Sequence, residues 1–218
     1  MFLKMALLPP TRAARIRLCI LLAILAGLAM YFRPDRFFAA LLYDKHEGDI
    51  VFQSLPHNDL SDAIEGISES QWSHCGVLVR DEGKWMVAEA IGEVRLTPLK
   101  LWLLRSRHCR FAAYRMDAMK EADMPRLRTA LNAMMGKPYD YHYAPDDSEI
   151  YCSELVFRAY ERGLGMKIGD WQKLGDLRWQ PFEKFIRSME QGELPLDREM
   201  ITPVALTRSP LVHRVSWW

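Results

Sequence analysis

The sequence predicts an α+β domain in which an antiparallel sheet packs against helices. Short alternating stretches, separated by turn residues, come first, and amphipathic helical stretches follow them. Consecutive strands joined by hairpin turns favour an antiparallel sheet over a doubly wound parallel one. At 218 residues, half of them apolar, the chain can bury one core, so we expect one domain over residues 33–218.

The expected strands lie between Gly48 and residue 114. Gly48 is a turn residue before a short strand that ends at Gln53. Residues 74–90 read as a β-hairpin, because Val77 and Val79 alternate in the first arm and Asp-Glu-Gly-Lys forms the turn. Further strands are expected at 94–98 and 109–114, and residues 54–73 are expected to form a loop or short helix.

Four helices are expected from apolar spacing and from stop signals. Pro98 opens one at 99–104, and Gly136 ends an amphipathic one at 122–135. A short helix at 36–43 precedes the strands, and another begins near Cys152 and stops at Gly163.

The N-terminal residues 1–32 have the pattern of a signal-anchor or signal peptide. An uncharged apolar run at 18–32 follows four basic residues, which are Lys4, Arg12, Arg15 and Arg17. The run is shorter than the roughly 20 residues that usually span a bilayer. We expect an uncleaved membrane anchor with the domain outside the cytoplasm, in the periplasm or cell envelope. The alternative is a cleaved signal and a secreted domain.

Charge and cysteine spacing exclude several classes of function. The net charge is +1 with no basic stripe, which argues against nucleic-acid binding. The four cysteines form no CxxC and no Cys/His cluster with zinc spacing, so we expect neither a metal nor another cofactor. Cys75 and Cys109 both fall in expected strands, and a disulfide between them is a minority interpretation in an oxidising compartment.

Cys152 is the candidate nucleophile. It follows a polar, loop-like stretch and precedes apolar residues at helical spacing, so it lies at a helix N-terminus. The helix dipole and the unpaired N–H groups there stabilise a thiolate, which is the reactive form of cysteine. Most free cysteines are simply small buried side chains, so this position needs a base beside it to indicate catalysis.

His74 and Glu89 are the candidate base and its orienting carboxylate. His74 begins the first arm of the hairpin and Glu89 ends the second, so the two are close to cross-strand partners. A carboxylate beside histidine fixes the imidazole tautomer and raises its basicity. With Cys152 at the same end of the sheet, the three residues form a nucleophile, a base and an orienting group.

Five motifs in chain order resemble the permuted papain-like amidases of the YiiX/YaeF group, which are relatives of NlpC-type cell-wall peptidases. They are G-D-I-V-F-Q at 48–53, S-H-C-G at 73–76, A-E-A before V-R-L-T-P-L, G-K-P-Y-D at 136–140 and Y-C-S-E-L-V at 151–156. The resemblance implies a circularly permuted papain-like fold in which the histidine precedes the cysteine. Carried over by position, Cys152 is the nucleophile, His74 the base and Glu89 the third member. Cys75 departs from the small or aliphatic residue expected after the histidine.

These residues predict acyl transfer to water through a thioester. The Cys152 backbone N–H is expected to bind the oxyanion, with Gln53 as a weaker candidate and Tyr151 and Ser153 near the substrate. The resemblance implies a peptide or acyl-amide substrate from the cell envelope. The alternatives are a lipid-directed thiol hydrolase or acyltransferase, and a membrane-tethered binding module without catalysis. Oligomeric state, scissile bond and acyl acceptor are left open by the sequence.

Overall fold

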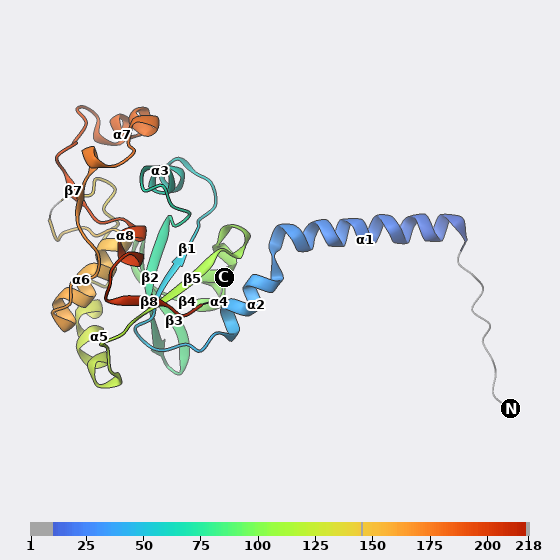
Figure 1. Cartoon of the computed structure of the whole chain (residues 1–218), viewed down its shortest axis with the longest axis horizontal. Coiled ribbons are helices and arrows are strands. Elements are labelled where there is room, and N and C mark those ends of the chain that lie inside the picture. Colours follow the sequence, from blue (N-terminus) through green and yellow to red (C-terminus); the bar gives the residue numbers. More distant parts are fainter. Residues whose placement is uncertain (1–10, 145, 217–218) are drawn as a thin grey trace.

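A six-stranded antiparallel sheet forms the centre of the domain (Figure 1). The computed structural model describes residues 11–144 and 146–216. In the sheet the strands run in the order β4-β3-β2-β1-β5-β8, and every neighbouring pair is antiparallel. The strands are β1 (Ile50–Gln53), β2 (His74–Asp81), β3 (Lys84–Ile91), β4 (Glu93–Pro98), β5 (Phe111–Met116) and β8 (Val212–Arg214).

The hairpin of β2 and β3 forms as expected. Asp81 pairs with Lys84 across a two-residue turn in which Glu82 and Gly83 have φ values of 46° and 77°. Positive φ at both positions is the signature of the turn that matches strand twist in tight hairpins. In this register Val77 pairs with Ala88, so Glu89 lies opposite residue 76 and diagonal to the first residue of β2.

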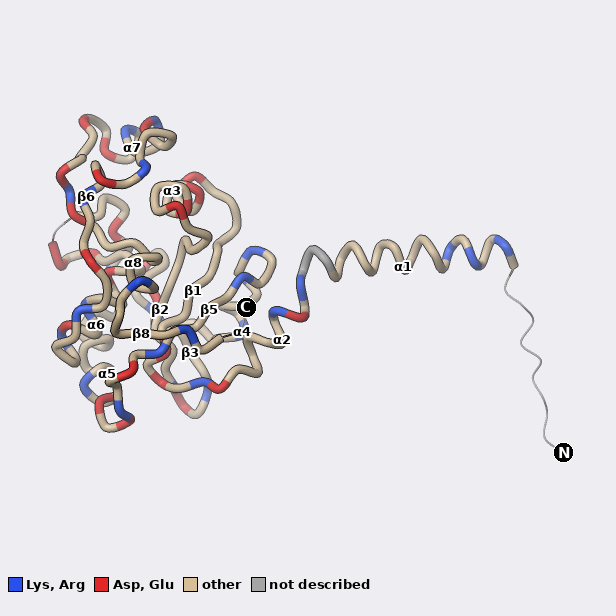
Figure 2. The backbone as a smooth tube through the Cα atoms, in the orientation of Figure 1, with Lys and Arg blue, Asp and Glu red and all other residues tan. Residues whose placement is uncertain are grey.

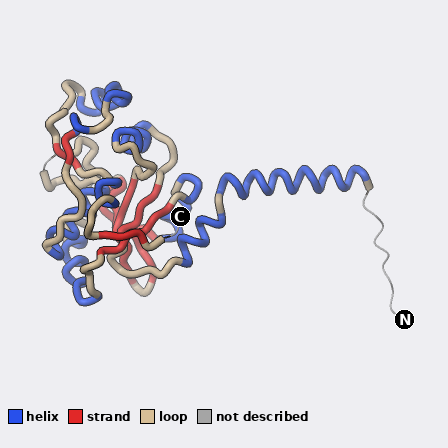
Figure 3. The backbone as a smooth tube through the Cα atoms, viewed as in Figure 1, coloured by secondary structure: helices blue, strands red, loops and turns tan. Residues whose placement is uncertain are grey.

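Helices cover both faces of the sheet (Figure 3). Cys75, Val77 and Val79 point to the face where α5 (Met124–Asn132) and α6 (Cys152–Leu164) pack. Alternate residues such as Leu78 point to the other face, where they meet α2 and α4. These two helices run over Pro34–Leu42 and Leu99–Arg105.

The C-terminal third adds short elements beside α6. This part of the chain contains a two-stranded sheet, short helices and irregular segments, and it covers the start of that helix. They are β6 (Gln172–Lys173), η3 (Leu174–Asp176), η4 (Gln180–Phe182), α7 (Glu183–Glu190), β7 (Glu199–Met200) and α8 (Pro203–Thr207).

The short helix that was one of the two expectations for residues 54–73 is present as α3 (Asp59–Ile67), which the side chain of Asn58 caps. The structure corrects two other expected elements. The helix expected at 122–135 is shorter, because η2 (Glu121–Asp123) precedes α5. The strand expected from residue 109 starts at Phe111, and Cys109 ends the short helix η1 (Arg107–Cys109).

The minority interpretation of a Cys75–Cys109 disulfide is wrong. Cys75 points to the sheet face that α6 covers. Cys109 lies in η1, which contacts α2 and α4 on the other side. The sheet therefore separates the two sulfur atoms, and neither is in a disulfide.

The N-terminal segment forms α1 (Arg12–Phe32), which projects away from the domain (Figure 1). Arg33, with φ of 48°, separates it from α2. Among the described residues, no single helix has both the length and the apolar composition to cross a membrane. The pair Arg12–Ala29 and Pro34–Leu42, bent by 45°, meets those two criteria together. Residues 1–10 of the expected signal-anchor, with Lys4, lie outside the described residues.

Candidate active site

Cys152 is the first residue of α6, and its sulfur lies among polar groups. Tyr151, the N-cap, is extended and offers no side-chain cap to the N–H groups of the first turn. The sulfur lies close to the His74 ring, the Cys75 thiol and the Cys75 backbone N–H, and each of these groups lowers the pKa of Cys152. A sulfur held in this way at a helix N-terminus is an environment that favours the thiolate.

His74 lies between the sulfur and a buried carboxylate. Its Nε2 atom is 2.5 Å from Glu89 Oε2, which leaves Nδ1 as the ring nitrogen available to Cys152. Trp102 of α4 packs near the imidazole, with ring centroids 6.3 Å apart. The histidine is 2% exposed, so its ring is fixed by packing as well as by hydrogen bonds.

Gly76 makes room for this arrangement. A Cβ atom at this position would lie 2.6 Å from the Ala88 carbonyl oxygen and 3.4 Å from Glu89 Cβ. Because the carbonyl oxygen belongs to the backbone of β3, this clash could be relieved only by moving β2 away from β3. The glycine therefore allows the two strands to hold His74 and Glu89 in contact.

Glu89 is fully buried and accepts three hydrogen bonds. Its Oε1 atom accepts from Thr97 Oγ1 at 2.6 Å, and Oε2 accepts from Arg105 at 2.5 Å as well as from His74. Thr97 comes from β4 and Arg105 from the last residue of α4. A buried carboxylate stays charged only when it is paired and hydrogen-bonded, which these partners ensure.

Arg105, Glu89, His74 and Cys152 thus form a row of alternating charge that is buried except at Arg105, whose side chain is partly exposed. Burial alone raises the pKa of Glu89, but the hydrogen bonds from His74 and Arg105 outweigh it and lower the pKa to about 2. Burial lowers the pKa of His74, yet its bonds to Cys152 and Glu89 raise it to about 9. The Cys75 thiol and the His74 ring lower the pKa of Cys152 well below its ordinary value. The geometry therefore favours a thiolate–imidazolium pair at neutral pH.

The structure places the three candidate binding residues differently from one another. Gln53 does not reach Cys152. Its amide fits by donating to the Trp102 carbonyl at 2.9 Å and accepting from Arg105 at 3.1 Å. It therefore supports the arginine behind Glu89, and the expectation that it completes an oxyanion hole is not supported.

Tyr151 and Ser153 anchor the start of α6 to the C-terminal segment. The Tyr151 hydroxyl accepts from the Ile201 N–H at 3.0 Å, and Ser153 Oγ donates to the Ile201 carbonyl at 2.7 Å. Both residues also line a cavity beside Cys152. Their polar atoms are engaged with backbone, and their expected place near the substrate stays a prediction.

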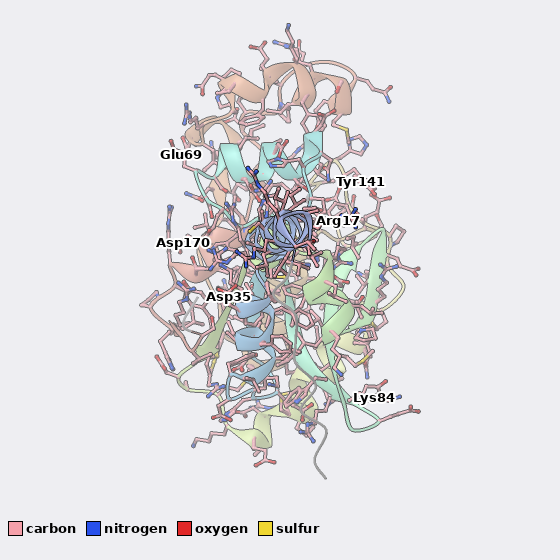
Figure 4. All side chains as sticks on the ribbon, turned by 90° about the vertical axis from the view of Figure 1, so that its right-hand side faces the viewer. Arg17, Asp35, Glu69, Lys84, Tyr141 and Asp170 are labelled. Atoms are coloured by element: carbon pink, nitrogen blue, oxygen red, sulfur yellow. The ribbon has the colours of Figure 1, made fainter. Side chains whose placement is uncertain are left out.

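A largely apolar cavity of about 70 Å³ opens beside Cys152. Its walls come from α3, the loop before α6, α7 and the segment before α8. In Figure 4, Tyr141 of that loop and Glu69, which follows α3, lie toward one end of the molecule. Lys84, next to the hairpin turn, lies toward the other end. The apolar lining residues include Ala63, Ile64, Ile67, Leu174, Ile186, Met189, Met200 and Ile201.

Tyr143 brings a hydroxyl into the same region. Its ring packs against Tyr151 with centroids 4.5 Å apart, and both rings line the cavity with Cys152. The Tyr143 hydroxyl is buried, contacts the Tyr139 hydroxyl, and makes no hydrogen bond of normal geometry in the described part of the chain. Tyr143 also adopts a φ of 53°, which is uncommon for a bulky residue.

Sequence reasoning missed Thr97, Arg105 and Tyr143. Thr97 lies on the same face of β4 as Arg95, which pairs with Glu89, so strand alternation could have found it once the register was known. Arg105 lies one residue beyond the expected end of α4, and its role depends on how that helix packs. No local pattern distinguishes Tyr143 from other loop tyrosines.

Comparisons with known proteins place the chain in a family. Residues 44–216 match the family described as "Permuted papain-like amidase enzyme, YaeF/YiiX, C92 family". The uncharacterized protein YiiX of Escherichia coli K12 is 30% identical over 180 residues, which cover 81% of this chain and 89% of YiiX.

A solved structure shows the same fold. The crystal structure of YiiX from Escherichia coli O157:H7, described as a metalloprotein, superposes with a TM-score of 0.77 at 30% identity. The match covers 81% of this chain and 99% of that one. Within residues 11–144 and 146–216 of this chain, no group of three or more His, Cys, Asp or Glu side chains could hold a metal ion. The chain belongs to the permuted papain-like amidase family of the YaeF/YiiX type.

Proposed function

We propose that the chain is a thiol hydrolase that cleaves an amide through a thioester on Cys152, with a cell-envelope peptide as its substrate. The observation that carries this proposal is the buried row Arg105–Glu89–His74, which ends at the sulfur beside the cavity. Such a row supplies a nucleophile, a proton donor and acceptor, and a group that fixes the imidazole. Membership of an amidase family supports the reaction class.

The first half of the reaction transfers the acyl group to sulfur. The Cys152 thiolate attacks the carbonyl carbon of the amide, and negative charge moves to the carbonyl oxygen. When the C–N bond breaks, the His74 imidazolium donates its Nδ1 proton to the leaving nitrogen. The products of this half are a free amine, a thioester and a neutral histidine.

We assign two donors to the oxyanion. The Cys152 backbone N–H lies in the uncapped first turn of α6, where the helix dipole also favours negative charge. The Tyr143 hydroxyl is buried near the same sulfur without a well-aligned partner. We assign it the second position in place of Gln53.

The second half of the reaction releases the acid. Neutral His74 takes a proton from water, and the resulting hydroxide attacks the thioester carbon. The C–S bond then breaks and restores the thiolate beside the imidazolium. Glu89 keeps its charge throughout, because it serves to hold the ring and to stabilise the imidazolium.

The cavity favours a second candidate function, the hydrolysis or transfer of an acyl chain. Its lining is mainly apolar, and Cys152 lies in its wall. An apolar chain would gain about 0.8 kcal/mol for each methylene buried there, whereas a charged peptide would gain little. A substrate with a long acyl group is therefore the alternative to a cell-envelope peptide.

Two substrate sets decide between these candidates. Wild type and Cys152→Ala are incubated with purified cell wall, and separately with acyl amides of increasing chain length. Peptide release that depends on Cys152 supports the peptidase. A mass gain equal to the acyl group on Cys152, increasing in yield with chain length, supports the acyl enzyme. Failure with both sets would contradict both substrate assignments.

A variant in the cavity wall sharpens this test. Ala63, which is 2% exposed on α3, lines the cavity without touching the charged row. Ala63→Phe would fill part of the cavity and lower the reaction with long-chain amides by about tenfold, which corresponds to 1.4 kcal/mol of lost binding. Cys152 alkylation by iodoacetamide would stay unchanged. If Ala63→Phe lowered the reaction with short-chain and long-chain amides by the same factor, the result would contradict an acyl site in this cavity.

We also propose that the N-terminal segment attaches the enzyme to a membrane, with the domain outside the cytoplasm. Arginines mark the outer end of α1, and the rest of the helix carries no charge (Figure 2). Apolar side chains of α1, α2 and α4 are exposed to solvent in this structure. These include Leu21 and Leu22 on α1, Phe38 and Leu42 on α2, and Leu101 and Leu104 on α4.

Flotation with lipid vesicles tests the attachment. The full chain should float with the vesicles, and a Leu21→Lys, Leu22→Lys variant should remain in the dense fraction, because charges in an apolar run oppose insertion. Equal flotation of both proteins would contradict attachment through α1. The mass of the mature chain recovered from cells distinguishes an anchor from a cleaved signal.

A further inference from the structure

Cys75 is a second buried thiol in direct contact with the candidate nucleophile. It follows His74 on β2, is fully buried and points toward α6. Its thiol and its backbone N–H lie close enough to the Cys152 sulfur to lower the pKa of that residue. Both cysteines belong to one buried cluster in which β2 packs against α6.

The Cys75 thiol takes no part in the proton transfers of the proposed hydrolysis. His74 supplies and takes the proton, and the oxyanion donors lie elsewhere. A small aliphatic side chain would fill the same space without placing a second sulfur beside a reactive one. Burial and the neighbouring Cys152 thiolate raise the pKa of Cys75, so it remains a protonated donor while Cys152 is ionised.

We propose that Cys75 is a resolving thiol, which forms a reversible disulfide with Cys152 after peroxide has oxidised that residue. The disulfide would block the nucleophile and protect it from irreversible oxidation. The two residues are neighbours in the same buried cluster, where β2 packs against α6, so the sulfur atoms can approach to the S–S bond length of about 2.05 Å.

The two chemical steps balance with a peroxide as the oxidant. The Cys152 thiolate attacks one oxygen of hydrogen peroxide, the O–O bond breaks, and the departing hydroxide takes a proton to become water. The Cys75 sulfur then attacks the Cys152 sulfenic acid, the S–O bond breaks, and the Cys75 proton leaves with hydroxide as a second water. Two thiols are oxidised to one disulfide, and one peroxide is reduced to two waters.

The arrangement of the site selects which sulfur meets the oxidant first. Cys152 lines the cavity, so a small peroxide can reach it from there. Cys75 lies behind Cys152, under α6, and is not among the residues that line the cavity. Cys109 is on the opposite side of the sheet and Cys19 is on α1, which makes both suitable as comparison sites.

The test follows the mass of Cys152 in the full chain after treatment with hydrogen peroxide. Wild type should lose two hydrogens and yield a linked pair of peptides that contain Cys75 and Cys152. Alkylation of Cys152 should vanish and return in full after dithiothreitol. In Cys75→Ser, which replaces the sulfur with a smaller oxygen on the same side-chain skeleton, Cys152 should gain two oxygens as sulfinic acid and stay unlabelled after dithiothreitol. Cys109→Ser should behave as wild type.

The state of the variants before oxidation controls for misfolding. Cys75→Ser and Cys75→Ala should each be alkylated at Cys152 in the reduced state, which shows that the nucleophile is present and accessible. The proposal is overturned if wild type yields no Cys75–Cys152 peptide pair and reaches sulfinic acid as fast as the variants. It is equally overturned if Cys152 pairs with Cys19 or Cys109.

Discussion

Replacing Glu89 with glutamine removes one charge from the middle of the buried row while keeping its shape. The pKa of Glu89 is lowered from 4.5 to about 2, because the carboxylate is held by His74 and Arg105. A shift of this size corresponds to about 3 kcal/mol of stabilisation of the folded, charged form. Since the folded pKa is the lower one, this stabilisation is present above about pH 4.5 and disappears as the pH falls toward 2.

The expected result is a pH-dependent gap between wild type and Glu89→Gln. At neutral pH, the free energy of unfolding should be about 3 kcal/mol larger for wild type, and about 2 kcal/mol of this gap should disappear between about pH 5 and pH 3. Urea unfolding followed by tryptophan fluorescence measures it. Glu93→Gln, an exposed carboxylate on β4, serves as the matched control and should follow wild type. A gap that stays constant over this pH range would refute the argument that Glu89 is held as a buried anion.

Three further changes probe the same site. Thr97→Val removes a hydrogen bond to a buried carboxylate and should cost about 1.5–3 kcal/mol in the free energy of unfolding, whereas Thr97→Ser should cost much less. Gly76→Ala forces β2 away from β3 and should abolish Cys152 labelling at about pH 6, so unchanged labelling would contradict the close packing. The rate of amide hydrolysis should fall as the pH rises through about 9, where His74 loses the proton that the leaving group needs. A rate that stays constant to about pH 10 would contradict this role.

The parts of the site that follow from local pattern were predictable. Cys152 was placed at a helix N-terminus by loop chemistry on one side and apolar spacing on the other. His74 and Glu89 were brought together by the hairpin, and only the register differed, because the turn contains two residues and sets Glu89 diagonal to His74. Alternation along a strand carries this kind of information.

The parts that depend on packing between distant elements were not predictable. Arg105 reaches Glu89 because α4 packs on the sheet face opposite to α6. No periodicity in residues 99–105 shows which group the side chain of its last residue contacts. About half of the residues that line the cavity lie between residues 174 and 203, where short helices and strands alternate with irregular chain and the sequence shows little periodicity. Contact between Cys75 and Cys152 depends on where the start of α6 meets β2, which no local pattern shows, and the minority interpretation that paired Cys75 with Cys109 is wrong.

Alkylation of Cys152 by iodoacetamide across pH, in wild type and in His74→Ala, tests the thiolate–imidazolium pair most directly. Labelling is followed on the Cys152 peptide by mass spectrometry, so that the other cysteines do not contribute. Wild type should react rapidly at about pH 6, and His74→Ala should follow an ordinary thiol with a pKa near 8.5. Slow labelling that follows the ordinary thiol curve in both proteins would contradict the pair and the hydrolase proposed from it.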